Sequence, residues 1–217
     1  MQKDKFPFIL IVLLIAISLG AGWWLTKQNP SQMAGADDTA QSGDTTQSGT
    51  ARIGGDFTLV DQNGESYSSE QLKGQHALVF FGFTHCPDIC PMGLSTITNA
   101  LDSLPETTAT QITPVFISVD PARDTPARMK EYAENFHPSL VALTGDEAAI
   151  AQTADAFKVF YRKAEVPADA EGNYMVNHSG YIYLMGPDGE YLRHFTSNDQ
   201  PEKLADAIRD AVGGTEG

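Results

Sequence analysis

Long apolar runs alternate with segments of helical periodicity in the larger, C-terminal part of the chain. Residues 77–83 (ALVFFGF) and 112–119 (ITPVFISV) are almost continuously apolar, which is typical of parallel strands buried on both faces. Between them, leucine and isoleucine recur at helical spacing over residues 94–104, after Pro91 and before Pro105. The pattern predicts a strand–helix–strand unit whose two strands lie at the centre of a sheet.

Shorter patterns on both sides of this unit complete an α/β chain. Asn63-Gly64 and Pro187-Asp188-Gly189 are turn sequences between short apolar segments, so each predicts an antiparallel hairpin. The remaining elements expected are helices over 125–136, 146–160 and 204–211 and a strand over 140–143. Together they predict a mixed central sheet flanked by helices.

The N-terminal segment follows a different pattern. Residues 6–25 (FPFILIVLLIAISLGAGWWL) carry no charge and have the length that a helix needs to cross a bilayer. Lysines lie ahead of this segment, within residues 1–5, which predicts a short cytoplasmic N-terminus. The expected arrangement is a single-pass anchor in a bacterial inner membrane, with the C-terminal part on the periplasmic side. A cleaved signal peptide is the alternative, because residues 18–22 are small.

Residues 26–52 are rich in Gln, Ser, Thr, Gly and Asp and contain little that could be buried. Such a composition predicts a flexible linker. The folded domain is therefore expected to span residues 53–217.

Acidic residues outnumber basic ones, and the formal net charge of the 217-residue chain is −14. Binding to nucleic acid requires clustered Lys and Arg that neutralise phosphates, so this class of function is excluded. The ordinary consequence of such acidity is solubility.

Cys86 and Cys90 are the only cysteines, and they lie in the segment HCPDIC between the predicted strand and helix. Amide groups and the dipole at a helix start stabilise thiolates, so the pair is placed to be reactive. A structural disulfide is disfavoured, because a bridge across five residues restricts little chain entropy. The pair alone is compatible with both a redox dithiol and a metal site.

A third ligand would distinguish these two uses, since two thiolates and an imidazole suit copper. His178 directly precedes a predicted strand, where loops at sheet ends commonly form ligand sites. His85 is the rival, because it adjoins Cys86 in the sequence. The other candidates are expected to be structural, surface or core residues: His76, His137, His194, Met92, Met175 and Met185.

Residues 81–91 (FGFTHCPDICP), 117–136 (ISVDPARDTPARMKEYAENF) and 177–192 (NHSGYIYLMGPDGEYL) resemble the Sco/SenC family. The resemblance implies a thioredoxin-like fold and one copper ion, Cu(I) or Cu(II), held by Cys86, Cys90 and His178. It also implies copper delivery to the binuclear copper A site of cytochrome c oxidase. The implied partners are the copper-bearing oxidase subunit, other copper chaperones and thioredoxin-like reductants. Asn177 departs from the Asp of many members; because its amide can still hydrogen-bond, copper binding is expected to survive while redox poise or transfer differs.

Two other activities use the same cysteines. A thiol-disulfide reductase that reduces the oxidase copper-site cysteines would need Cys86 and Cys90 but not His178. The segment between Pro167 and Pro187 contains no proline to serve as the cis-proline of thioredoxins, which disfavours a broad reductase. Peroxide removal ranks lowest, because the Pro-x-x-x-Thr-x-x-Cys pattern of thioredoxin-like peroxidases is missing.

The segment Asp120-Pro121-Ala122-Arg123-Asp124-Thr125-Pro126 also follows the family pattern. One interpretation is that Asp120 supports the metal ligands or faces a partner. The other is a turn at the end of a strand, followed by a helix cap built from Asp124 or Thr125.

Overall fold

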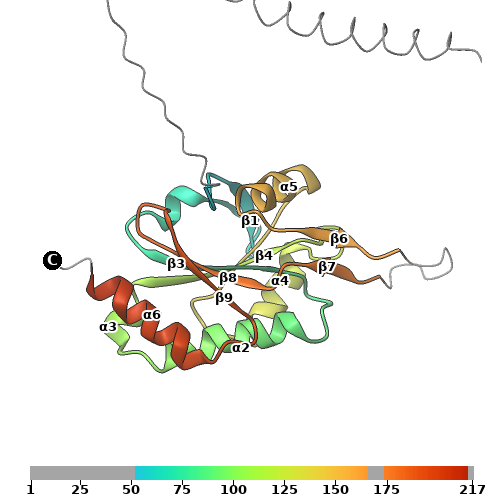
Figure 1. Ribbon diagram of the computed structural model, residues 1–217. Helices are drawn as coiled ribbons and strands as arrows, with labels where there is room; N and C mark the ends of the chain where they lie inside the picture. The colour runs from blue at the N-terminus through green and yellow to red at the C-terminus, as the bar shows by residue number, and fades with distance from the viewer. Residues whose placement is uncertain (1–51, 166–173, 215–217) are drawn as a thin grey trace, which may run out of the picture. The chain divides into compact units, whose positions relative to one another are not determined.

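The computed structural model describes residues 52–165 and 174–214, and a seven-stranded mixed sheet forms its centre. The strands lie in the order β2-β1-β5-β4-β3-β8-β9 (Figure 1). Their bounds are β1 Thr58–Asp61, β2 Ser66–Ser68, β3 His76–Gly82, β4 Ile112–Ser118, β5 Val141–Thr144, β8 Tyr181–Met185 and β9 Tyr191–Thr196. This is the predicted mixed sheet of a thioredoxin-like α/β fold.

The strand–helix–strand unit predicted from the apolar runs is confirmed. Every residue of β3 is buried, and β3 pairs with β4 in parallel from His76 opposite Ile112 to Gly82 opposite Ser118. Burial on both faces is the reason that both strands read as continuous apolar runs. The crossover between them is α2 (Ile89–Asp102), which begins before Pro91 rather than after it.

Helices cover both faces of the sheet. Besides α2, the described residues form the helices η1 Ser69–Leu72, α3 Glu106–Ala109, α4 Pro126–Ala133, α5 Glu147–Ala156 and α6 Pro201–Gly213. Figure 1 shows α2 and α6 below the sheet and α5 above it. The buried stripe of α6, which includes Leu204 and Ile208, is the one expected from its helical spacing.

Three features differ from the predicted pattern. The helix predicted to reach residue 160 ends at Ala156, because Lys158 adopts a positive φ of 57° that an α-helix cannot continue. The short helices η1 and α3 were not expected. A separate two-stranded sheet, β6 (Tyr161–Lys163) with β7 (Val176–His178), was also not expected, because three residues per strand give no periodicity to recognise.

The predicted N-terminal segments 1–5, 6–25 and nearly all of 26–52 lie outside the described residues. Within the part of the chain that is described, no helix has the length and apolar character needed to cross a bilayer.

Candidate metal centre

The cysteines occupy the connection between β3 and α2. We call residues 83–88 the cysteine loop; it carries Cys86, while Cys90 lies in the first turn of α2 and is fully buried. Gly82 makes room for Cys90, because a Cβ atom at Gly82 would lie 2.6 Å from the Cys90 Sγ atom. The sulfur of Cys90 therefore packs directly against the backbone of a central strand.

Asp124 fixes the cysteine loop from the segment between β4 and α4. Its carboxylate is completely buried and accepts hydrogen bonds from the Thr84 N–H at 3.0 Å and the Thr84 hydroxyl at 2.6 Å. A third hydrogen bond comes from the Ser118 hydroxyl at 2.6 Å. The predicted helix cap is built by Thr125 instead, whose side chain accepts from the Arg128 N–H. Asp124 thus couples the cysteine loop to the core rather than capping α4.

His178 reaches the cysteines from the β6–β7 hairpin (residues 160–165 and 174–179). In this hairpin His178 lies opposite Tyr161. Tyr174 begins the second segment of the hairpin, and its hydroxyl donates a hydrogen bond to the buried Asp120 carboxylate at 2.5 Å. Arg123 also binds Asp120 and lies over the Tyr174 ring, 3.7 Å from its centroid. Asp120 therefore ties the histidine-bearing hairpin to the end of β4.

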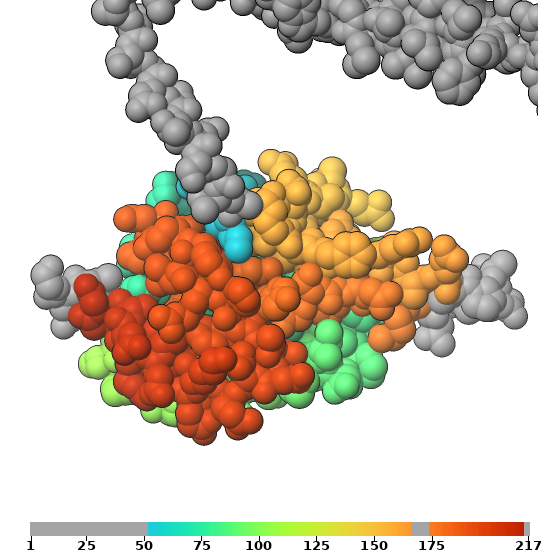
Figure 2. All heavy atoms as spheres, in the orientation of Figure 1, coloured from blue at the N-terminus to red at the C-terminus, as the bar shows by residue number. Residues whose placement is uncertain are grey.

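The ligand atoms of Cys86, Cys90 and His178 lie within 4.8 Å of one another. His178 Nε2 is 3.2 Å from the Cys90 Sγ atom. Among the residues that the structure describes, this is the one cluster of at least three His, Cys, Asp or Glu side chains able to hold a metal ion. Figure 2 shows the yellow-orange hairpin beside the green atoms of the segment that leads into α2.

Two members of the cluster, Cys86 and His178, line an open groove of about 290 Å³, which we call the site groove. Its eight lining residues are Cys86, Pro87, Asp88, Ile89, Met175, Val176, Asn177 and His178. Asn177 is exposed, so the residue that differs from the family's usual Asp faces solvent. An incoming ion can therefore reach the ligands from one open side.

The two thiols differ in acidity. The pKa of Cys86 is lowered from its usual 9.0 to about 4, chiefly because the Cys90 side chain hydrogen-bonds to its thiolate, with smaller contributions from the N–H groups of Asp88 and Cys90; burial acts in the opposite direction. The hydrogen bond to Cys86 and burial raise the pKa of Cys90. The sequence predicted two reactive thiols at the helix start, whereas the structure makes Cys86 alone the stable thiolate.

The imidazole of His178 is oriented by the backbone. Its Nδ1 atom is 3.1 Å from the Ser179 carbonyl oxygen, which can only accept a hydrogen bond. Nδ1 therefore carries the proton, and in the neutral ring the lone pair of Nε2 faces the cysteines. Phe83 packs edge-on against the ring, with 5.7 Å between the centroids. These contacts present to the two sulfurs a nitrogen that is able to bind a metal.

The rival histidine does not join the cluster. His85 is exposed, and its Nδ1 atom contacts the Thr84 hydroxyl at 3.2 Å and the Asp124 carboxylate at 3.8 Å. The remaining three are elsewhere: His76 is buried at the start of β3, His137 bonds Ser139, and His194 contacts Tyr191 on β9.

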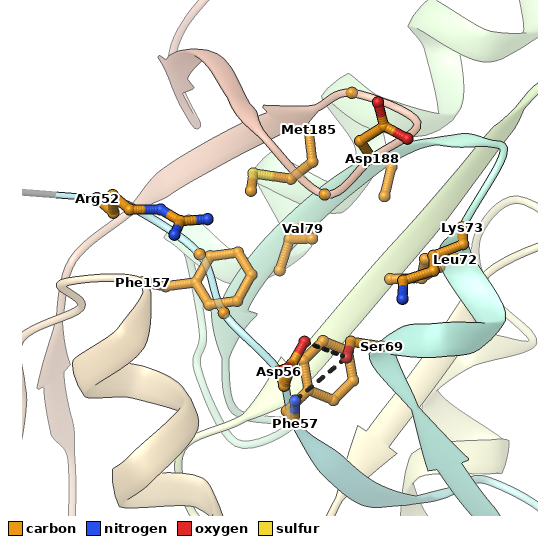
Figure 3. Close-up of a pocket in the computed structure, with 15 residues that line it drawn as sticks. Arg52, Asp56, Phe57, Ser69, Leu72, Lys73, Val79, Phe157, Met185 and Asp188 are labelled. Atoms are coloured by element: carbon orange, nitrogen blue, oxygen red, sulfur yellow. Dashed lines mark hydrogen bonds between the residues drawn. The ribbon is translucent and has the colours of Figure 1, made fainter.

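A second cavity, of about 110 Å³, lies away from the cysteines (Figure 3). Its walls include Ala77 and Val79 at the amino end of β3, together with Phe157 and Met185. The cysteines follow the opposite, carboxyl end of the same strand. None of the residues that line this cavity is a cysteine or histidine, so it offers no thiolate or imidazole ligand.

Comparison with known proteins identifies the family. The sequence model of the SCO1/SenC family matches residues 45–213. The chain belongs to the SCO1/SenC family. An SCO2-like protein from Rickettsia conorii is 40% identical over 212 residues, which cover 96% of this chain and 99% of the relative.

Solved SCO1/SenC structures have the same fold. The copper-bound structure of Bradyrhizobium japonicum ScoI is 41% identical to this chain, with a TM-score of 0.67, and the match covers 73% of this chain and 99% of ScoI. BsSco, described as a member of the Sco family of cytochrome c oxidase assembly proteins with a disulfide switch, is 28% identical, with a TM-score of 0.58 and coverage of 74% and 94%. The thioredoxin-like fold expected from the sequence is confirmed.

Three supporting residues could not be assigned from the sequence. Gly82 could have been recognised in part, because a glycine inside a buried strand often indicates that another group lies close to the backbone. Asp124 was considered only as a helix cap. Tyr174 gave no signal, since its partner Asp120 lies 54 residues away in the chain.

Proposed function

We propose that this protein holds one copper ion through Cys86, Cys90 and His178 and delivers it to the copper A site of cytochrome c oxidase. The observation that carries the proposal is the convergence of the three ligand atoms within 4.8 Å. Two sulfurs favour Cu(I), and the imidazole nitrogen helps to hold Cu(II), so the donor set fits this cargo. The copper-bound structure of the ScoI relative supports copper binding, and the description of BsSco as an oxidase assembly protein supports a role in oxidase assembly.

The three proposed ligands would bind the ion in different protonation states. Cys86 is a thiolate at neutral pH, so its sulfur is ready to bind without losing a proton. Nε2 of His178 offers its lone pair, and Cys90 gives up its proton as the metal binds. Because the site groove is open, a partner's ligands can replace those of this chain one at a time. Delivery then requires no change of fold.

The low pKa of Cys86 also favours a second function, reduction of a disulfide in the oxidase copper-site subunit. The Cys86 thiolate would attack one sulfur of that disulfide and displace the other as a thiolate. Cys90 would then lose its proton and attack the mixed disulfide, which releases the substrate as a dithiol and leaves a Cys86–Cys90 disulfide. A dithiol reductant, such as a thioredoxin-like protein, would have to restore the starting state.

We also propose the arrangement in which this chemistry takes place. Residues 6–25 anchor the chain in a bacterial inner membrane, residues 26–52 form the linker, and residues 53–217 form the copper-binding domain on the periplasmic side. On that side of the membrane, the domain could contact an oxidase subunit whose copper site also faces the periplasm. Other copper chaperones are the expected source of the ion.

A copper titration of the reduced, full-length chain tests the proposal, with His178→Ala and His85→Ala as matched variants. We expect one tightly bound Cu(II) with thiolate-to-copper absorption in the wild type and in His85→Ala. Loss of the imidazole in His178→Ala should weaken Cu(II) binding by about 100-fold. Zn(II) at equal concentration should not displace the copper, since copper binds such ligands more tightly.

The outcomes separate the two functions. If the wild type binds no copper but Cys86 and Cys90 still reduce a disulfide substrate, the chaperone proposal is wrong and the reductase is supported. Equal copper binding by His178→Ala and the wild type would remove His178 from the ligand set.

A further inference from the structure

Met175 is an exposed methionine in the wall of the site groove. The residue is 45% exposed, although most large apolar side chains of the fold are buried. Among the other methionines described, Met129 and Met185 are buried in the core, and Met92 is half-buried on α2 outside the groove. Met185 is therefore a core residue, whereas Met175 is a surface residue in the groove that holds Cys86 and His178.

We propose that the thioether of Met175 is a further ligand to Cu(I), on the solvent side of the Cys86, Cys90 and His178 cluster. The inference rests on the proposed copper-binding function. A thioether is a soft ligand that favours Cu(I) over Cu(II). It is neutral and carries no proton, so it adds no charge to a site that already has two thiolates.

The position of Met175 suits this role. It lines the site groove together with Cys86 and His178, and its carbonyl oxygen accepts a hydrogen bond from the Ala164 N–H at 2.8 Å, which fixes its backbone in the hairpin. Its side chain has three rotatable bonds beyond this fixed point and can adapt its reach within the groove. Of the other sulfur and imidazole groups that line the groove, Cys86 is buried and His178 is half-buried, so Met175 is the most exposed of them.

The charge of the groove favours the approach of a cation. Asp88 is acidic, and none of the eight lining residues is Lys or Arg. When Cu(I) arrives from a donor, a bond from copper to Met175 forms as one bond from copper to the donor breaks. Bonds to the buried sulfurs then replace those remaining to the donor. Copper stays Cu(I) throughout, and the released donor ligands keep their own electron pairs.

Selenomethionine labelling of the full-length chain tests the proposal, because X-ray absorption at the copper edge detects selenium bound to copper. The reduced, labelled protein is loaded with one equivalent of Cu(I) as wild type, as Met175→Leu and as the matched control Met92→Leu. We expect copper–selenium scattering in the wild type and in Met92→Leu, and its loss in Met175→Leu. Cu(I) affinity should fall about tenfold in Met175→Leu, while Cu(II) affinity stays unchanged.

Each contrary result has a distinct meaning. One equivalent of bound Cu(I) without copper–selenium scattering in the wild type would overturn the role of Met175 and leave the proposed function standing. Scattering that persists in Met175→Leu would also overturn it, since another methionine would be the ligand. Failure of the wild type to bind Cu(I) would overturn both. Leucine has a similar shape at this exposed position, so the circular dichroism spectra of the three forms should coincide.

Discussion

The two halves of the ligand cluster are both anchored by aspartates of the segment after β4, but in different ways. Asp124 holds the cysteine loop through two hydrogen bonds to Thr84, and all these groups are buried. Asp120 holds the β6–β7 hairpin through one hydrogen bond from Tyr174, a partly buried side chain. The cysteine half is therefore part of the core, whereas the histidine half is attached to it.

The two sheets that carry these halves also differ in how firmly they are held in the fold. The cysteine loop continues β3, which pairs with β4 and β8 at the centre of the seven-stranded sheet. The strands of the hairpin have three residues each and pair only with one another. Because an isolated two-stranded hairpin is marginally stable, the hairpin should open at a lower free energy than the cysteine loop. The proposed copper site would therefore keep its sulfurs fixed and release its nitrogen ligand first.

The largest effect is expected when the buried anchor is removed. Asp124→Ala leaves the Thr84 N–H and the hydroxyls of Thr84 and Ser118 without their acceptor, so the free energy of unfolding should fall by about 3 kcal/mol. Urea unfolding of the reduced protein measures this loss. Thr125→Ala is the matched control, because it removes only the N-cap of α4 and should cost about 1 kcal/mol.

Hydrogen exchange adds the regional test of Asp124→Ala. Amide protection should fall in the cysteine loop and change less in the β6–β7 hairpin. If Asp124→Ala costs no more than Thr125→Ala, Asp124 is not the anchor of the cysteine half.

The next effect concerns the two sulfurs. With a pKa of about 4, Cys86 stays a thiolate as the pH falls from 9.0 to near 4, where an ordinary thiol would already be protonated. Cys90 has a raised pKa and stays protonated over this range. Iodoacetamide at pH 6 should therefore modify Cys86 at least about 100-fold faster than Cys90, as measured by mass spectrometry.

The pH profile checks the same assignment. The rate at Cys86 in the metal-free, reduced protein should be nearly constant from pH 9 to pH 5 and should fall below that. Equal rates at the two cysteines, or a midpoint near pH 9 for Cys86, would contradict the division between thiolate and thiol.

Much of the fold could be predicted because its elements are long or have distinctive turns. β3 and β4 are buried on both faces, so their apolar runs were sufficient, and Asn63-Gly64 marked the β1–β2 hairpin. The β6–β7 hairpin could not be predicted, because three-residue strands lack a period and pair across a long connection. The end of α5 depended on the positive φ of Lys158, which its side chain does not reveal.

In the site, the candidate ligands could be predicted from the sequence, but the contacts that support them could not. Cys86 and Cys90 were evident from their spacing, and the resemblance to the Sco/SenC family singled out His178 against His85. The supporting contacts could not be predicted, because Thr84 with Asp124 and Tyr174 with Asp120 are pairs set by tertiary packing. The difference in pKa between the cysteines has the same origin, since it depends on which sulfur the other groups surround.

The smallest effect is expected when the hairpin loses its hydrogen bond to the core. Tyr174→Phe removes the hydroxyl that donates to Asp120 but keeps the ring beneath the Arg123 guanidinium. The fold should remain, while amide exchange in the β6–β7 hairpin becomes faster. Because His178 is then less well positioned, Cu(II) affinity should fall about tenfold, as is typical when a residue that positions a metal ligand loses its contact. Competition with a chelator measures this loss.

Tyr161→Phe is the matched control, because it removes a hydroxyl from the same hairpin and leaves the bond between Tyr174 and Asp120 in place. It should bind Cu(II) as the wild type does, and the cysteine loop should keep its amide protection in both variants. If Tyr174→Phe instead loosens the cysteine loop as much as the hairpin, the two halves move as one unit. The division between a fixed thiolate half and a releasable histidine half would then be wrong, and copper release would have to begin at a sulfur.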